Sequence, residues 1–539
     1  MTVWFSPEAF DEEDRARLAP YFTDLDGPVF ALVNLPEVTK GALFARYSRS
    51  AKPLRRLFLD EFAEHAEAGG ESGWRDDVGV ERAEKLYERV FVEYGDDSIA
   101  QVGGVHLACE QSSQILAKVL EWGRIMAYLE QSTRYVPYDD RPGGRWRYAV
   151  PPEVEAAGLG DRFKETCDRA FETYARWLKP MQEFYEHLFP HDPGDSDFVY
   201  RSTIRAKACD TLRGLLPAAT RTNIGIYGTG QAYEQLLLRM RANPLQEVRA
   251  YGDLMLAELR KVIPAFLRRV DIPDRGGAWS EYLARTRNET ATVASAVTEG
   301  RRYEPRSEVV LTDFDPEGEV KVTAAALYAV TDLPDDQLLE IARRMGHEER
   351  TQVLKAYVGE RTNRRHKPGR AFERTGYRFD ILCDYGAFRD LQRHRLLTIE
   401  WQELSPRHGY ELPPEVDGAG ALEDWTRTMG EAGALWQELR SAGLGSAAQY
   451  AVSLAHRIRF VMQMNAREAM HMIELRTTPQ GHPVYRRICQ RMHRLIADQA
   501  GHRAIAEAIR YADHSQVELE RLEAERRAEA KRRAAGTRP

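Results

Sequence analysis

The chain contains an internal repeat, and this repeat limits the possible folds more than any other feature of the sequence. The segment RYAVPPEVEAAG begins at Arg147 and HGYELPPEVDGAG begins at His408, so the shared Pro-Pro-Glu-Val starts at residues 151 and 413. Further along, LLLRMRANPLQEVR ends at Arg249 and MIELRTTPQGHPVYR ends at Arg486. The landmarks keep their order while their spacing drifts, as loop insertions would cause. We therefore expect a duplicated domain.

The repeat divides the 539 residues into two copies, which we place at 28–272 and 305–515. The polar segment 273–304 between them predicts a linker or connecting helix, and the Glu-, Arg- and Ala-rich segment 516–539 predicts a charged helical or disordered tail. Within each copy, strand-like segments precede and separate amphipathic helices without regular β-α alternation. This pattern indicates an α+β fold of two tandem domains, each a β-sheet core flanked by helices. We expect residues 453–475 to form one long helix, because their apolar residues follow helical spacing.

The composition excludes several classes of protein. Hydrophobic residues make up 43% of the chain and the net charge is -7, which favours a folded core and argues against a protein that coats nucleic acid. The five cysteines are far apart and form no C-x-x-C pair, which is typical of a reducing compartment and not of a zinc ribbon. No signal peptide and no run of 18 apolar residues is evident, so we expect a cytoplasmic protein without a membrane segment. Neither a Walker loop nor His-rich metal spacing is evident, so we predict no metal.

Two arginine-containing segments carry the chemistry of the repeat. Residues 393–395 read Arg-His-Arg and are followed by Ser-Pro-Arg at 405–407, and a looser version begins with Trp-Gly-Arg at 122–124. Arginine presents a rigid fork of donors and serine a short hydroxyl, so such segments suit phosphate or a polyanionic cofactor. A single Arg-His-Arg is weak evidence, because a solvated basic face has the same composition.

The extended pattern resembles a known signature, Arg-His-Arg-x-x-Ser-x-Asn-Glu-x-Ser-x-Arg-Tyr, of the flavin-dependent thymidylate synthases, the ThyX family. WGRIMAYLEQSTRY (122–135) resembles it without gaps, and RHRLLTIEWQELSPRH (393–408) resembles it with two extra residues. Asn-Ala-Arg at 465–467, followed by Arg476, resembles the closing motif of the family, and His471 stands where the family has Asn or His.

This resemblance implies that each copy keeps the half of the site that the other has lost. The first copy has Gly228 near the expected Asn, whereas the second has Gln449 at the position of the phosphate-contacting Arg and Ser453 in place of the Pro. The implied substrate-binding residues, all in the first copy, are Glu130, Ser132, Arg134 and Arg213. The implied cofactor-binding residues, all in the second copy, are Arg393, His394, Arg395, Asn465, Arg467 and His471. The implied catalytic residue is Arg476, near the uracil.

The resemblance further implies the reaction. An enzyme of this family methylates dUMP to dTMP with methylenetetrahydrofolate, FAD as hydride carrier and NADPH as reductant. We expect a homodimer, because two duplicated chains can rebuild a tetramer-like assembly, with a small-molecule nucleotide as the substrate and with neither nucleic acid nor membrane as a partner.

Several alternatives stay open at this point. Asp390 stands where the family often has a Gln that meets the nucleotide, which favours a relative that acts on another uracil nucleotide or transfers a different one-carbon unit. A non-catalytic nucleotide-binding or assembly protein would keep the same scaffold. For the individual residues, Ser132 could be an N-cap, Arg213 and Arg476 could be surface ion-pair partners, and Asn465 could cap a helix.

Overall fold

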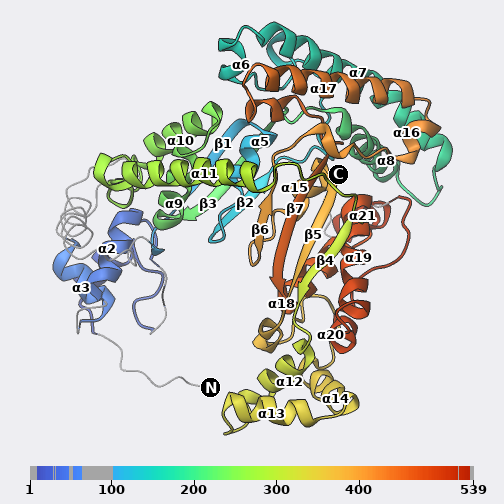
Figure 1. Cartoon of the computed structure of the whole chain (residues 1–539). Helices are drawn as coiled ribbons and strands as arrows, with labels where there is room; N and C mark the ends of the chain where they lie inside the picture. The colour runs from blue at the N-terminus through green and yellow to red at the C-terminus, as the bar shows by residue number, and fades with distance from the viewer. Residues whose placement is uncertain are drawn as a thin grey trace. The chain divides into compact units, whose positions relative to one another are not determined.

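The computed structural model describes residues 9–27, 30, 32–47, 52–63, 101–519 and 521–534. The chain folds into two compact units (Figure 1). The first unit comprises residues 1–110, 125–130 and 223–300, and the second comprises 111–124, 131–222 and 301–539. None of the helices in the described part of the chain is long and apolar enough to span a bilayer.

The first unit contains most of a three-stranded sheet with the strand order β1-β3-β2. Its strands are β1 (Gly104–Ser113), β2 (Met126–Glu130) and β3 (Arg221–Thr229). Strands β2 and β3 are antiparallel, and buried and exposed residues alternate along β3, so one face of the sheet packs against the core. The helices of this unit are α1 (Glu12–Leu18), α2 (Glu37–Tyr47), α3 (Leu54–Glu61), α9 (Gly230–Arg241), α10 (Gln246–Leu259) and α11 (Ala278–Val297).

The second unit contains a four-stranded antiparallel sheet with the order β4-β5-β7-β6. Its strands are β4 (Val309–Phe314), β5 (Gly376–Asp384), β6 (Thr398–Trp401) and β7 (Arg457–Asn465). Its α-helices are α5 (Gln114–Leu120), α6 (Pro152–Ala156), α7 (Gly160–Leu188), α8 (Asp197–Leu212), α12 (Gly318–Tyr328), α13 (Asp335–Arg344), α14 (His347–Val358), α15 (Tyr385–Leu391), α16 (Pro414–Gly418), α17 (Leu422–Ser441), α18 (Ala466–Arg476), α19 (Pro483–Asp498), α20 (Arg503–Ala508) and α21 (Leu522–Ala534). The two sheets with their helices confirm the expected α+β class with two tandem domains.

The prediction of one long helix over residues 453–475 was wrong. Strand β7 occupies Arg457–Asn465, and helix α18 begins only at Ala466. Ile458, Phe460 and Met462 are buried while the residues between them are not, which is the two-residue period of a strand. The side chain of Asn465 then accepts a hydrogen bond from the Glu468 N–H at 2.9 Å and caps the new helix.

Corresponding parts of the two copies meet within the second unit. Pro217 forms a β-bridge with Ser453, and these two residues occupy equivalent positions in the repeat. Helices α7 and α17 lie side by side (Figure 1), and Arg169 donates at 2.9 Å to Glu431, which stands 262 residues further on, the offset of the Pro-Pro-Glu-Val landmarks. A position that meets its own equivalent is the mark of a two-fold arrangement. The duplicated segments are therefore related by an internal two-fold in this unit.

Candidate active site

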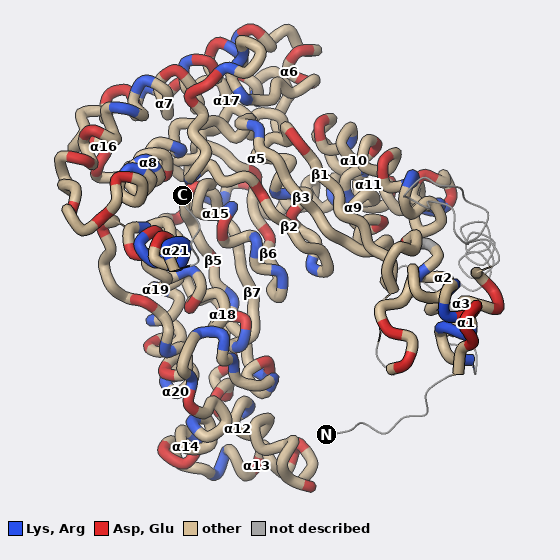
Figure 2. The backbone as a smooth tube through the Cα atoms, turned by 180° about the vertical axis from the view of Figure 1, so that it is seen from behind, with Lys and Arg blue, Asp and Glu red and all other residues tan. Residues whose placement is uncertain are grey.

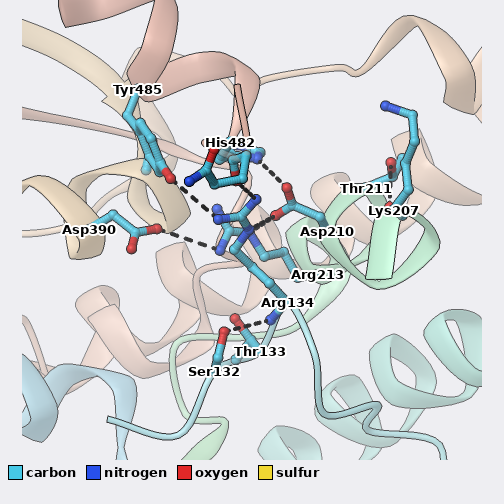
Figure 3. Close-up of polar contacts among 12 residues, drawn as sticks. Ser132, Thr133, Arg134, Lys207, Asp210, Thr211, Arg213, Asp390, His482 and Tyr485 are labelled. Atoms are coloured by element: carbon cyan, nitrogen blue, oxygen red, sulfur yellow. Dashed lines mark hydrogen bonds and ion pairs between the residues drawn. The ribbon is translucent and has the colours of Figure 1, made fainter. Parts of the chain in front are cut away.

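A buried carboxylate joins the two copies at one point of the second unit. Asp210, on α8 of the first copy, lies 3.1 Å from Arg134 Nε and 3.2 Å from Arg213 Nε through its Oδ1 (Figure 3). Its Oδ2 lies 2.9 Å from Nδ1 of His482, at the start of α19 in the second copy. Burial alone would raise the pKa of Asp210, but Arg134, His482 and Arg213 hold it well below the usual value. Asp210 is therefore ionised and orients both arginines.

A second buried carboxylate links this cluster to the end of α18. Asp390 Oδ2 lies 3.9 Å from Arg213 Nη1, and its Oδ1 lies 3.7 Å from Nη1 of Arg476. Burial would raise the pKa of Asp390, but Arg393, Arg476, Arg213 and Arg134 outweigh it and lower the pKa to about 2. The cluster thus sets four arginines against the carboxylates of Asp210 and Asp390, and its positive surplus suits an anionic ligand.

The candidate phosphate-binding residues of the first copy come from two elements. Arg134 is held by the hydroxyl of Tyr485, at 3.3 Å from Nη1, and by the carbonyl of Gln480, at 3.2 Å from Nη2. The Ser132 hydroxyl accepts from the Arg134 N–H at 3.3 Å, so Ser132 closes a turn and does not cap a helix. Arg213 follows α8 directly and is only 4% exposed, which excludes the alternative of a surface ion-pair partner. Its Nη2 is buried and has no hydrogen-bond partner among the described residues.

Glu130 is the one candidate residue that the second unit does not contain. It ends β2, where it pairs with Ile224 of β3, and it is 7% exposed. It belongs to the first unit, whereas Ser132, Arg134 and Arg213 belong to the second.

On the candidate cofactor side, His394 connects Arg476 to Glu468. Arg476 Nε donates to His394 Nε2 at 2.9 Å, and His394 Nδ1 lies 3.3 Å from Glu468 Oε1. Because a guanidinium only donates, Nε2 must be the acceptor, and the ring proton is on Nδ1, facing Glu468. Burial, Arg476 and Lys367 lower the pKa of His394 well below its usual value, which agrees with this neutral tautomer.

The Arg-His-Arg tripeptide does not present its three side chains to one place. Arg393 Nε lies 3.8 Å from Glu121 Oε2, whereas Arg395 is exposed and His394 is buried. The three residues can therefore contribute to different parts of a site, and a single cationic face is not formed.

The motif Asn-Ala-Arg at 465–467 forms the start of α18. Arg467 donates to the carbonyl of Pro368 at 3.0 Å, and its Nη1 lies 3.5 Å from Glu373. Asn465 caps the helix through its oxygen, as the simpler interpretation expected, which leaves its amide NH₂ as a further donor. Burial lowers the pKa of His471 to about 4, and its ring centroid lies 5.6 Å from that of His394.

Three of these residues form a group that the sequence spacing did not predict. Ligand atoms of His394, Glu468 and His471 lie within 4.8 Å of one another, close enough to share a metal ion. Both ring nitrogens of His394 are engaged, however, and Lys367, Arg467 and Arg395 act electrostatically on Glu468. This basic surrounding favours an anionic group over a cation.

None of the five cysteines, which all lie in the described part of the chain, is placed to act as a nucleophile. All are free and buried. Burial raises the pKa of Cys109 and Cys489 to about 12 and that of Cys209 to about 11. A buried thiol with a raised pKa is inert.

Sequence reasoning missed Asp210, His482 and Tyr485, although two signals were available. Asp210 stands three residues before Arg213, one helical turn away and on the same face. His482 and Tyr485 lie in the repeated landmark that ends at Arg486, and their counterparts in the first copy are Leu245 and Val248. Polar residues in one copy opposite apolar residues in the other indicate a site that only one pairing forms.

The counterparts of Arg213 and Arg134 in the second copy are neutral or exposed. Gln449 occupies the position equivalent to Arg213, and its side-chain oxygen accepts a hydrogen bond from the Leu404 N–H at 2.9 Å. Arg407, which stands for Arg134, is exposed and lies over the ring of Trp436, 5.1 Å from its centroid.

The first copy also lacks a counterpart of Arg467, the arginine at the start of α18. Gly230 stands where the second copy has Arg467, and a Cβ there would come within 2.7 Å of the ring of Phe266. An aromatic side chain therefore fills the space in which the second copy places a guanidinium.

The depressed pKa of Asp390 makes a prediction about acid stability. We expect the free energy of unfolding of the wild-type protein to fall by about 2 kcal/mol more than that of Asp390→Asn as the pH is lowered from about 4 to about 2. A carboxylate with a lowered folded-state pKa stabilises the fold above its unfolded pKa, and this contribution is lost as the pH falls to about 2. Urea unfolding of both proteins across this range checks the expectation. Asp210 is present in both proteins, so its contribution cancels in the difference between them. Parallel curves of the free energy of unfolding against pH would contradict the expectation.

Comparison with known proteins agrees with the duplication. The model of the family described as thymidylate synthase complementing protein matches residues 43–265 and again 309–500. A UPF0159 protein of Chlamydia muridarum is 38% identical over 527 residues, covering 97% of this chain and 99% of that protein. A UPF0159 protein of Thermoplasma acidophilum is 31% identical over 522 residues, covering 92% of this chain and 99% of that protein. A flavin-dependent thymidylate synthase of Clostridium tetani is 24% identical over 190 residues, which is 35% of this chain and 70% of that protein.

The two family matches fall in the two copies that the repeat defines, in the same order along the chain. The relatives from Chlamydia and Thermoplasma share nearly the whole duplicated length, whereas the Clostridium enzyme matches only a part of it. The resemblance seen in the motifs is therefore confirmed: the chain belongs to the flavin-dependent thymidylate synthase (ThyX) family, as a tandem duplication of two divergent copies.

Proposed function

We propose that the protein is an FAD-dependent thymidylate synthase-like methyltransferase that converts dUMP to dTMP, with methylenetetrahydrofolate as the carbon donor and NADPH as the reductant. Each chain has one composite site, built from the nucleotide side of the first copy and the flavin side of the second. The opposite pairing, which has lost the arginine cluster, is inactive.

One observation carries this proposal. Arg134 and Arg213 of the first copy share the buried carboxylate of Asp210 with His482 of the second copy (Figure 3). Arg213 also shares the buried carboxylate of Asp390 with Arg476 of the second copy. A phosphate monoester carries between one and two negative charges near neutral pH, and charge-assisted bonds to arginine are its usual means of recognition. The unpaired Nη2 of Arg213 is a donor available for such a phosphate.

The residues around α18 fit a flavin dinucleotide. Asn465 has an amide donor left after capping, and Arg467 and Lys367 bring positive charge to the same helix start. Asn465, Arg467, His471 and the 393–395 segment would hold the cofactor, whose pyrophosphate is dianionic. When bound and reduced by NADPH, the flavin would supply the hydride that reduces the transferred carbon to a methyl group.

The protein itself positions and polarises the pyrimidine. Arg476 is fixed on two sides, by His394 at Nε and by Asp390 at Nη1, and so presents a rigid cation. A fixed cation beside the uracil ring favours the ionised or polarised form of the base, and this electrostatic help costs no reorganisation during the reaction. Ser132, Arg134 and Arg213 bind the phosphate at the other end of the nucleotide, so the base is held in one orientation.

Purified protein reconstituted with FAD should show flavin absorbance. It should also release tritium from [5-³H]dUMP when NADPH and methylenetetrahydrofolate are present. Absence of flavin binding would contradict the hypothesis that the protein is a flavin enzyme, whichever nucleotide it acts on. A nucleotide-binding or assembly role would then be left. We also propose a homodimer, which sedimentation of the same preparation can check.

A second candidate substrate is favoured by Asp390. Its ionised carboxylate lies between Arg213 and Arg476, the proposed phosphate and base ligands. It accepts hydrogen bonds at both oxygens, whereas a neutral amide accepts at one end and donates at the other. Another uracil nucleotide would then be methylated in place of dUMP. Flavin binding without tritium release from dUMP would support this candidate, and a panel of uracil nucleotides in the same assay would identify the substrate.

A further inference from the structure

The helix at the end of the described chain contacts the loop that carries Arg134. Arg521, immediately before α21, places its guanidinium carbon 4.0 Å from the ring centroid of Tyr135. Arg134, the neighbour of Tyr135 in the chain, lies 5.8 Å from the same ring. The proposed chemistry uses Arg134 but assigns no role to Tyr135 or to the charged tail.

Contacts of arginine side chains hold α21 against α8 and the turn that precedes it. Arg526 binds Asp195 with two contacts, Nε to Oδ1 at 2.6 Å and Nη2 to Oδ2 at 2.9 Å. Arg532 lies 5.2 Å from the ring centroid of Phe198, on the first turn of α8. No residue of α21, all of which is described, is buried, and Lys and Arg are numerous on the helix (Figure 2). The helix therefore docks by ion pairs and cation–π contacts and not by an apolar face.

The ring of Tyr135 belongs to a tight turn that sets the phosphate ligands. The Tyr135 N–H donates to the Ser132 carbonyl at 3.2 Å, and the Val136 N–H donates to the same carbonyl at 3.1 Å. The Ser132 hydroxyl meets the Arg134 N–H within this turn. The backbone of Tyr135 is therefore bonded into the same turn as Ser132 and Arg134.

We infer that Arg521 is a positioning residue for the phosphate end of the site, and that α21 is the strap that carries it. Arg521 acts through the ring of Tyr135 and holds the Ser132–Val136 turn in the conformation that binds phosphate. This inference rests on the proposed function, because it gives the turn a phosphate-bearing substrate. Arg521 contacts no reacting group in this scheme, so it affects substrate affinity and not the chemical step.

The test compares Arg521→Met, which removes the charge and keeps most of the volume, with Arg521→Lys, which keeps a cation. We expect Arg521→Met to raise the KM for dUMP about two- to fivefold with kcat unchanged, since an exposed cation–π contact has this strength. Arg521→Lys should restore most of the affinity. A chain that ends at Leu519 should lose at least as much affinity as Arg521→Met. The matched control is Arg533→Met, because the Arg533 side chain is 71% exposed and, among the described residues, its ion pair is with Glu529 of the same helix.

Amide hydrogen exchange provides a second readout that needs no substrate. Arg521→Met should speed exchange at the amides of Arg134, Tyr135 and Val136, while Arg533→Met should not. If the wild-type enzyme turns over dUMP and Arg521→Met leaves both KM and exchange unchanged, the inference is overturned. A fall in kcat at constant KM, or an equal effect of Arg533→Met, also overturns it. If the wild-type protein neither binds nor converts dUMP, the proposed function fails instead, and exchange alone decides whether α21 holds the turn.

Discussion

Replacement of Arg476 by alanine is expected to lower tritium release from [5-³H]dUMP by about 10²- to 10³-fold, the usual cost of removing one preorganised group that stabilises charge in a transition state. Arg476 ends α18 and is held by His394 and Asp390, so its guanidinium has a fixed place and needs no reorganisation. Flavin binding should survive, because the proposed flavin ligands at the start of α18 are untouched. The loss should appear mainly in kcat, since the residue is proposed to act on the base and not on the phosphate.

Arg213→Ala is expected to abolish the same activity for a different reason. Arg213 is buried between Asp210 and Asp390, so its removal takes away a phosphate ligand and leaves two carboxylates facing each other with less compensation. Both effects raise the KM for dUMP, and the second also weakens binding of any anion.

The control for both substitutions is Arg239→Ala. Arg239 is the counterpart of Arg476 in the first copy, where it lies on α9, and burial lowers its pKa. In a chain with one composite site, its loss should leave tritium release within about twofold of wild type, after allowance for any change in stability. Losses as large as those of Arg476→Ala would contradict the idea that only one pairing of the copies is active.

The repeat and the motifs predicted much of this arrangement from the sequence. The shared landmarks are local and keep their order, so the duplication and the α+β class could be predicted without any long-range contact. The complementary losses, Gly228 in one copy and Gln449 in the other, also predicted which half each copy supplies. The structure brings Arg134, Arg213 and Arg476 into one cluster, as a composite site requires.

What the sequence could not show depends on contacts between distant segments. Residues 453–465 have apolar positions that fit both a helix and a strand, and only pairing with β5 decides for the strand. Asp210 and His482 are 272 residues apart, so their contact is visible only in the fold. The same holds for the ion pair between Arg361 and Glu474, which joins the loop between α14 and β5 to the helix that presents Arg476.

That ion pair should be among the most costly to break. Arg361 and Glu474 are bound through both pairs of atoms, at 2.7 and 2.6 Å, and their side chains are 1% and 2% exposed. Arg361 also donates to the carbonyl of Ala508 at 2.7 Å, and Tyr511 donates to the Arg361 carbonyl at 2.6 Å, so the pair ties α18 to two other segments. Glu474→Leu leaves a buried guanidinium without a counter-charge and is expected to lower the free energy of unfolding by about 3–5 kcal/mol.

An exposed ion pair of the same geometry shows how much of the expected destabilisation is due to burial. Arg343 and Glu317 have the same two-contact geometry, at 2.8 and 2.9 Å, but their side chains are 47% and 43% exposed. Glu317→Leu should therefore cost at most about 1 kcal/mol by the same chemical denaturation. The double replacement Arg361→Met with Glu474→Leu should recover part of the loss, because it removes the unpaired charge as well as its partner. If Glu474→Leu is no more destabilising than Glu317→Leu, the buried pair does not hold α18 in place, and the fixed position of Arg476 must come from His394 and Asp390 alone.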